Sequence, residues 1–195
     1  MLGVPAGPQK KKVSAVEAFQ VGAAVFGRRG AGLLAEETDL YALSDEERSA
    51  FRNRHIGVIP QGRTALRSLT VLENVLLPSR LYVQKSENVL EYRDRALALL
   101  EKLSIGHLKD AWPNELSGGE LRRLSIARAL IMSPDILLAD EPTGDLDDEN
   151  TGSVLKLLRE KADGGTAVLL VTHEQSAAAY ADRVLTMQEG RLSGG

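Results

Sequence analysis

Two short, continuous apolar runs stand out in the second half of the chain, DILLA at residues 135–139 and TAVLLV at residues 166–171. A segment with helical period, residues 151–161, separates them. Apolar runs of this length are typical of strands buried on both faces, and their alternation with helices indicates parallel pairing. The pattern therefore predicts an α/β fold with a mostly parallel sheet. The predicted strands are residues 56–59, 136–139, 166–171 and 183–187.

The other periodic segments are predicted to be helices. Ser44 is followed three positions later by Glu47, which is a capping-box pattern, and Thr70 stands where it could cap the next helix. Residues 1–34 are rich in Gly and Ala, and they show neither the helical nor the strand period. The predicted helices are residues 44–54, 69–77, 89–103, 121–132, 151–161 and 176–181.

Composition narrows the function classes. The 195 residues include 24 Lys and Arg against 27 Asp and Glu, and this net charge of −3 argues against a strongly basic nucleic-acid binder. The absence of cysteine excludes thiol chemistry and cysteine metal sites. No apolar run reaches the roughly 18 residues that a membrane span needs. We therefore expect a cytoplasmic protein with no nucleic-acid partner, whose link to any membrane goes through another protein.

A strand that runs straight into two carboxylates marks a first candidate site. In ILLADE, residues 136–141, Asp140 and Glu141 follow the apolar positions directly. Ligands of open parallel sheets lie beyond the carboxyl ends of the strands, so Asp140 could bind Mg²⁺ and Glu141 could polarise an attacking water. A strand followed by an acidic turn that Pro142 closes explains the hexapeptide equally well.

A glycine pair before a helix marks a second candidate site. In LSGGE, Gly118 and Gly119 would let backbone N–H groups approach an anion at the positive end of the following helix. The alternative is purely structural, because Ser117 and Glu120 form a capping box by themselves. On that alternative the arginines of the helix form a solvated face; they are Arg122, Arg123 and Arg128.

Two single polar residues also follow predicted strands. Gln61 comes after the strand at residues 56–59 and a proline, and His173 comes after TAVLLV. Both stand where a side chain can reach a ligand above the sheet. Taken alone, His173 is better explained as a helix cap or a surface histidine.

The order of these motifs resembles one family. Between residues 38 and 192, the succession of Gln61, LSGGE, LADEPTGDLD and TAVLLVTH is similar to the ATP-binding subunits of ABC transporters, most of all the lipoprotein-release and macrolide-export type. The resemblance implies a P-loop NTPase-like fold that uses ATP and Mg²⁺, with a helical insert at residues 64–114. It implies the following roles: Glu141, His173 and Gln61 are catalytic, with Glu141 as general base; Ser117, Gly118, Gly119, Glu120 and Asp147 contact ATP; Asp140 and Gln61 hold the metal.

The resemblance also implies partners. Two subunits of this family close head to tail around two ATP molecules, so that each site combines one chain's Walker motifs with the other's LSGGE. The expected partners are a second ATP-binding subunit, identical or not, and an integral membrane permease, with the chain peripheral on the inner face of the cell membrane. Within the insert, Leu69, Val71 and Leu72 are candidate permease contacts.

One motif of the family is missing. Hydrolysis on this fold uses a phosphate loop of the form G-x-x-x-x-G-K-[ST], and no stretch of the chain matches it. The nearest stretch, GPQKKKVS at residues 7–14, has Lys12 in place of the glycine and Val13 in place of the lysine. We therefore expect an N-terminally incomplete fold, in which residues 1–37 are a divergent segment and residues 38–195 are the ATPase-like domain. A shifted reading frame, a wrong start site or a decayed copy would each produce this boundary.

Three functions stay open at this point. The first is an ATP-binding subunit that couples ATP binding and hydrolysis to export or extraction through a permease. The second is a non-hydrolytic or decayed subunit that supplies only the LSGGE signature motif and a docking surface. The missing phosphate loop favours this second function. The third is a truncated product without a stable function, because losing the first strands would expose sheet edges.

Overall fold

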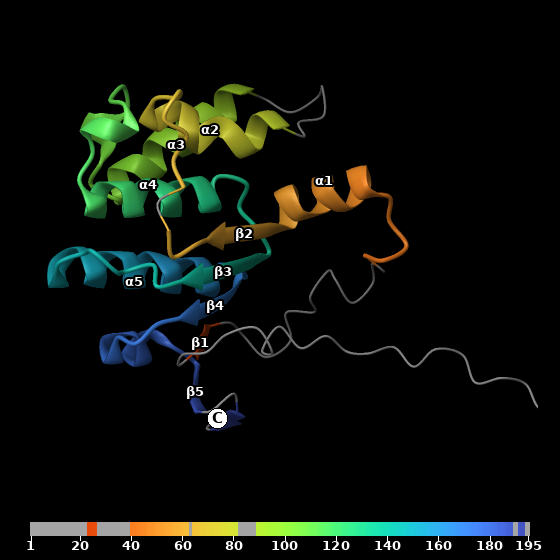
Figure 1. The fold of residues 1–195 in the computed structure, drawn as a ribbon, viewed down its shortest axis with the longest axis vertical. Coiled ribbons are helices and arrows are strands. Elements are labelled where there is room, and N and C mark those ends of the chain that lie inside the picture. Colours follow the sequence, from red (N-terminus) through yellow and green to blue (C-terminus); the bar gives the residue numbers. More distant parts are fainter. Residues whose placement is uncertain (1–22, 27–39, 63, 82–88, 189–190, 194–195) are drawn as a thin grey trace, which may run out of the picture.

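The computed structural model describes residues 23–26, 40–62, 64–81, 89–188 and 191–193 (Figure 1). The α-helices are α1 (Asp45–His55), α2 (Val71–Leu81), α3 (Val89–Lys102), α4 (Gly118–Leu130) and α5 (Asp148–Asp163). The strands are β1 (Ala23–Phe26), β2 (Ile56–Ile59), β3 (Ile136–Asp140), β4 (Ala167–Val171), β5 (Arg183–Gln188) and β6 (Arg191–Ser193). Short 3₁₀ helices are η3 (Gly106–Leu108), η4 (Pro113–Glu115) and η5 (Gln175–Tyr180).

The strands form one sheet in the order β2-β3-β4-β1-β5-β6. Strands β2, β3 and β4 pair in parallel, which confirms the predicted α/β fold. Strand β1 runs antiparallel to both β4 and β5, and β6 runs antiparallel to β5. Residues 1–34 show no strand period and yet contain β1, because the four residues AAVF are too few to show one.

The core lies between one face of the sheet and the helices. Alternate strand residues on that face are 0–3% exposed: Ile59, Leu137, Ala139, Val168 and Leu170. Helix α4 packs against β2 and α5 packs against β4, while α2 and α3 pack on α4 (Figure 1). At Gly57 a Cβ atom would lie 2.6 Å from the carbonyl oxygen of Ala129, so only glycine permits this approach of β2 to α4.

The start of α2 corrects one prediction about docking. Val71 and Leu72 are 0% and 7% exposed, so they belong to the core and the prediction that they contact a permease is wrong. Their backbone N–H groups donate to Ala111 and Lys109, which ties the first turn of α2 to the segment after η3. Leu69 is half-buried and Leu66, just before it, is 45% exposed.

Two helices begin three residues earlier than predicted. Helix α4 begins at Gly118 and α5 at Asp148, because Ser117 and Asp147 act as N-caps whose side chains accept backbone N–H groups of the first turn. Gly118 and Gly119 are therefore part of α4 and not of a loop before it. The nearest phosphate-loop candidate, residues 7–14, and the boundary at residue 38 lie outside the described residues, so the predicted domain division stays a prediction.

Candidate functional site

Three polar chain segments leave the sheet at the same edge. Ile59 of β2 pairs with Ala139 of β3, and Asp140 at the end of β3 pairs with Val171 at the end of β4. Because the three strands are parallel, the residues that follow each strand meet at their carboxyl ends. Gln61, Glu141 and His173 therefore emerge from neighbouring strands, as their positions in the sequence predict.

The carboxylate of Glu141 is held on both oxygens. Its Oε2 accepts a hydrogen bond of 3.1 Å from the Thr172 hydroxyl, and its Oε1 accepts one of 3.2 Å from the His173 backbone N–H. The same Oε1 lies 2.7 Å from His173 Nδ1. Glu141 is only 9% exposed and has a φ of 47°, a left-handed conformation that costs energy in a non-glycine residue. The fold thus keeps a strained, nearly buried carboxylate at the sheet edge.

His173 is electrostatically coupled to this carboxylate. The hydrogen bond that the imidazole donates to the Glu141 carboxylate, together with the charge of that carboxylate, raises the pKa of His173. The side chain of His173 is otherwise 74% exposed, so it can turn toward a ligand without leaving a buried cavity. His173 is a surface residue, as the alternative interpretation has it, and in addition its ring and its backbone N–H both contact Glu141.

Thr172 is a site residue that the sequence interpretation missed. Its hydroxyl donates to Glu141 and accepts a 3.1 Å hydrogen bond from the Glu174 backbone N–H, which fixes the direction in which the hydroxyl proton points. Thr172 is 8% exposed. A threonine that ends an apolar run is common in strands, so only the adjacent His173 could have drawn attention to it.

The described residues offer a limited but suitable donor set for Mg²⁺. Among them, no group of three His, Cys, Asp or Glu side chains lies close enough to form a metal site. Mg²⁺ bound with ATP usually takes one or two carboxylates, with phosphate and water oxygens as the other ligands. The half-buried Asp140 and the exposed Gln61 fit that chemistry, since one offers a carboxylate and the other an amide oxygen at the same sheet edge.

The signature motif, residues 117–120, forms the start of α4. The Ser117 hydroxyl accepts the Glu120 N–H at 3.3 Å, and the Glu120 carboxylate accepts the Ser117 N–H at 2.7 Å and its hydroxyl at 2.8 Å. These two donors lower the pKa of Glu120, and Arg123 and His107 add to the effect. Among the described residues, no hydrogen bond joins Ser117 or Glu120 to Glu141 or His173.

The signature motif instead packs against the turn that leads to α5. A Cβ atom on Gly119 would lie 3.2 Å from both the Asp145 carbonyl oxygen and Leu146 Cδ2, which is a tight approach. Asp147 caps α5 by accepting the Asn150 N–H at 2.8 Å, and this bond lowers the pKa of Asp147. The carboxylate of Asp147 is thus engaged within its own chain, and its predicted contact with ATP stays a prediction.

The arginines of α4 do not form a solvated face. Arg122 is 7% exposed and donates to the carbonyls of Pro60 and Gln61, while the half-buried Arg123 donates to Leu103 and to Asn150. Arg128 is also half-buried and binds Thr64, and burial lowers its pKa. The helix period could have revealed Arg122, because it shares a face with the buried Ile126 one turn later.

The fold is an α/β domain, and its candidate site lies at the carboxyl ends of parallel strands. The sequence profile of the ABC transporter family matches residues 26–144, more than half of the chain, and so begins before residue 38, where we expected the resemblance to start. The chain belongs to the ABC transporter family. Within the described residues, no helix is long and apolar enough to cross a membrane.

Individual relatives are consistent with this family. The chain is 44% identical over 152 residues to the lipoprotein-releasing system ATP-binding protein LolD of Xanthomonas campestris pv. campestris. It is 45% identical over 164 residues to LolD of Shewanella oneidensis. These alignments cover 77% and 84% of this chain, which spans 62% and 70% of the length of those proteins.

A solved structure of the family has the same fold. The ATP-binding cassette MJ0796, in a dimeric post-hydrolysis state bound to ADP and Pi, matches with a TM-score of 0.71 and 34% sequence identity. The match covers 78% of this chain and 68% of that one. The predicted P-loop NTPase-like fold of an ATP-binding cassette is thereby confirmed for the described part of the chain.

Proposed function

We propose that the chain is the ATP-binding subunit of an ABC transporter and couples ATP binding and hydrolysis to export or extraction through a partner permease. The observation that carries this proposal is the held carboxylate of Glu141, with Thr172 and His173 on its oxygens and Asp140 beside it in the chain. A buried carboxylate at the carboxyl end of a parallel strand suits a general base, since it is close to the bound phosphates and shielded from bulk water.

The proposed chemistry is attack of water on the γ-phosphate of ATP, which breaks the bond to the β,γ-bridging oxygen and releases ADP and phosphate. Glu141 accepts the proton of that water, for which its carboxylate must first exchange the Thr172 or His173 contact for the water. His173, released from Glu141, then stabilises charge on the phosphoryl group. Bound Mg²⁺ would neutralise charge on the phosphate oxygens, with Asp140 and Gln61 as its protein ligands.

The site is proposed to be shared between two subunits. Ser117, Gly118, Gly119 and Glu120, with Asp147, would complete the ATP site of a second ATP-binding subunit, whose own phosphate loop holds the nucleotide. The N-terminus of α4 suits this role because unpaired backbone N–H groups and the helix dipole attract phosphate. Since the chain lacks the G-x-x-x-x-G-K-[ST] pattern, we expect its own site to bind MgATP weakly.

The permease is proposed to dock on the helical insert and hold the chain at the inner face of the membrane. Exposed apolar residues before α2, at its end and at the start of α3 support this role: Leu66 is 45%, Leu81 59% and Leu90 69% exposed. The named relatives belong to lipoprotein-releasing systems, so a lipid-modified protein is the cargo that we propose. The choice of cargo itself would lie with the permease.

A complementation assay tests the shared site. A full-length LolD relative whose own signature serine has been replaced by arginine keeps its phosphate loop but should not hydrolyse ATP alone. Adding this chain should restore turnover, because Ser117 and its neighbours replace the lost motif. Adding the Ser117→Arg variant of this chain should restore none. Equal turnover after adding this chain and after adding its Ser117→Arg variant would refute the shared site.

The second candidate function is a subunit that does not hydrolyse ATP in its own site. It stays a candidate because the sequence does not contain the G-x-x-x-x-G-K-[ST] pattern, whereas the family match and the named relatives support the first function. Calorimetric titration of MgATP into the isolated chain tests the two functions. Tight binding, with turnover that Glu141→Gln abolishes, would show that the chain is a hydrolase by itself. Weak binding fits both functions, so the non-hydrolytic role would be assigned only if no turnover, by this chain alone or with an intact ATP-binding relative, depends on Glu141.

A further inference from the structure

The backbone that carries Gln61 is attached to α4 at two points. Arg122 Nη1 donates to the carbonyl oxygen of Pro60 at 2.7 Å, and its Nη2 donates to that of Gln61 at 2.5 Å. Arg128 Nη1 donates to the carbonyl oxygen of Thr64 at 2.8 Å, and its Nη2 contacts the Thr64 hydroxyl. The two arginines are six residues apart, or about 9 Å along the helix axis. Together they hold both ends of the chain segment that presents Gln61.

Arg122 is buried and paired in a way that fixes the orientation of the backbone it contacts. Its guanidinium is inside the protein, 7% exposed, where a charge is costly unless its donors are paired. Two diverging N–H groups on two successive carbonyls fix the direction of both peptide groups, which a single point charge cannot do. The guanidinium also faces the turn after Glu141, since its Nη2 lies 4.0 Å from the position of a Cβ on Gly144.

The chain beyond Thr64 is fixed to a different helix. The buried Asn74 of α2 accepts the Leu66 N–H at 2.8 Å and donates to the Leu66 and Leu69 carbonyls at 3.0 and 2.9 Å. The position of Gln61 is thus set by α4, and the loop that follows is set by α2.

We propose that Arg122, supported by Arg128, is a positioning residue that clamps the Gln61 backbone to α4. A displacement of α4 then displaces Gln61 with it. The clamp thus connects the start of α4, which is proposed to complete the ATP site of a second subunit, with Gln61, which is proposed to bind Mg²⁺ in this chain's own site. The inference rests on the proposed function for what Gln61 does there, but the clamp itself requires neither nucleotide nor partner.

A nitroxide probe at residue 62 tests the clamp directly. The chain has no cysteine, and a Cβ on Gly62 would have no atom within 4 Å, so Gly62→Cys gives one label in open space. A label in open space follows the motion of its backbone, so in the parent chain its electron paramagnetic resonance lines should be broadened by an ordered backbone. Arg122→Met should sharpen these lines strongly and Arg122→Lys less, since an ammonium reaches only one of the two carbonyls.

Arg123→Met is the matched control. Arg123 is the adjacent residue of α4 and also donates to backbone carbonyls, but its partners are Gly119, Leu103 and Asn150 and none lies in the segment that carries Gln61. It should lower the urea midpoint without mobilising the label. If Arg122→Met fails to fold, Arg122→Lys and Arg128→Met carry the test, and each should partly mobilise the label.

Two results would overturn the clamp. One is an unchanged spectrum in the Arg122 variants that fold, and the other is equal mobilisation by Arg123→Met. All measurements are made without nucleotide, so a failed complementation assay would refute the shared site while leaving the clamp intact.

Discussion

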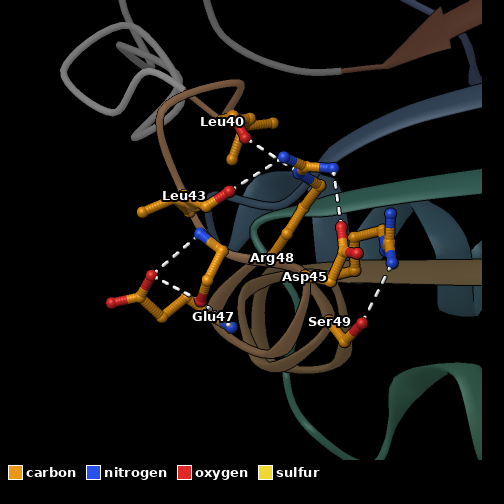
Figure 2. Close-up of polar contacts among 8 residues, drawn as sticks. Leu40, Leu43, Asp45, Glu47, Arg48 and Ser49 are labelled. Atoms are coloured by element: carbon orange, nitrogen blue, oxygen red, sulfur yellow. Dashed lines mark hydrogen bonds and ion pairs between the residues drawn. The ribbon is translucent and has the colours of Figure 1, made fainter.

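Helices α1 and α4 begin with the same capping box, and their comparison separates structural from functional residues. In α1 the Ser44 hydroxyl accepts the Glu47 N–H at 3.3 Å, and the Glu47 carboxylate accepts the Ser44 N–H at 2.9 Å (Figure 2). In α4 the corresponding distances between Ser117 and Glu120 are 3.3 and 2.7 Å. Helix capping therefore accounts for the serine and the glutamate of LSGGE, but not for its glycines.

The surroundings of the two caps differ. In α1 the first turn carries Asp45 and Glu46, and Arg48 folds back onto the Leu40 and Leu43 carbonyls, as Figure 2 shows. The cap of α1 is thus completed by residues close to it in the sequence.

Helix α4 has glycines at the two corresponding positions, and its start is joined to distant parts of the chain. Gly119 lies against the turn before α5, and Arg123 reaches α5 itself through Asn150. The glycines and the arginines of α4, and not its capping box, therefore distinguish the candidate site from an ordinary helix start.

The largest expected effect comes from Gly119→Val. A Cβ at this position would already lie 3.2 Å from the Asp145 carbonyl oxygen, so the added methyl groups force α4 away from the turn before α5. Overpacking of this kind costs about 1–3 kcal/mol. Displacing pre-organised anion donors lowers turnover by about a hundredfold. In the complementation assay we therefore expect Gly119→Val to lose nearly all activity.

Glu46→Val in α1 is the matched control, because Glu46 is the second residue of its helix just as Gly119 is of α4. It should leave complementation unchanged. Full activity of Gly119→Val would show that the glycine serves no purpose at the shared site.

The sequence predicted the α/β fold and the end of the sheet at which the candidate site residues lie, whereas the roles of those residues stay a prediction. Asp140, Glu141 and His173 could be recognised because each directly follows an apolar run, and parallel strands place such residues at one edge. The roles of Thr172 and Arg122 depend on distances between elements that are far apart in the chain. No local pattern reports such distances, although the shared helical face of Arg122 and Ile126 does indicate burial.

The helix boundaries and the sheet show the same limitation. The sequence pattern predicts a start of α4 at Leu121 because glycines weaken a helical pattern, whereas the cap by Ser117 keeps both glycines within the helix. Strand β1 has only four residues and pairs with two strands that come more than 140 residues later. Its place in the sheet is decided by tertiary pairing, which four residues cannot reveal.

The second prediction exchanges the first residues of the two helices. Gly118→Asp puts into α4 the acid that α1 has as Asp45, and a negative charge in the first turn stabilises a helix by about 0.3–1 kcal/mol. The same charge repels phosphate, so complementation should fall while the urea midpoint rises. Asp45→Gly should lower the midpoint without affecting complementation. A Gly118→Asp variant that complements normally would argue against phosphate at this helix start.

The third prediction concerns the caps themselves. Ser44→Ala and Ser117→Ala each remove the acceptor of a backbone N–H, and each should cost about 1 kcal/mol of unfolding free energy, measured by urea denaturation. Only Ser117→Ala should also reduce complementation. Equal stability losses with unequal activity losses would sharpen the distinction between the two helix starts. A Ser117→Ala chain that complements as well as Ser44→Ala would remove it.

The smallest expected effect is electrostatic. The pKa of Glu47 is lowered by its hydrogen bonds from Ser44 alone, whereas that of Glu120 is lowered by Ser117 and further by the charges of Arg123 and His107. A carboxylate whose pKa is lowered on folding stabilises the fold above its unfolded pKa of about 4.3 and loses that contribution as pH falls through the folded value. Both caps should therefore weaken in acid, below about pH 4.3.

Added salt should separate the two groups, because it screens the charges around Glu120 but not the hydrogen bonds that both share. In an NMR titration of the carboxyl carbons, raising the salt from about 0.01 to 1 M, where the Debye length falls from about 30 to 3 Å, should raise the pKa of Glu120 more than that of Glu47. In Arg123→Met this difference should shrink, since the cation nearest the cap is gone. Equal responses of both pKa values to salt in the parent chain would show that the surroundings of Glu120 are no more positive than those of Glu47. The attraction of the start of α4 for phosphate would then rest on the helix dipole alone.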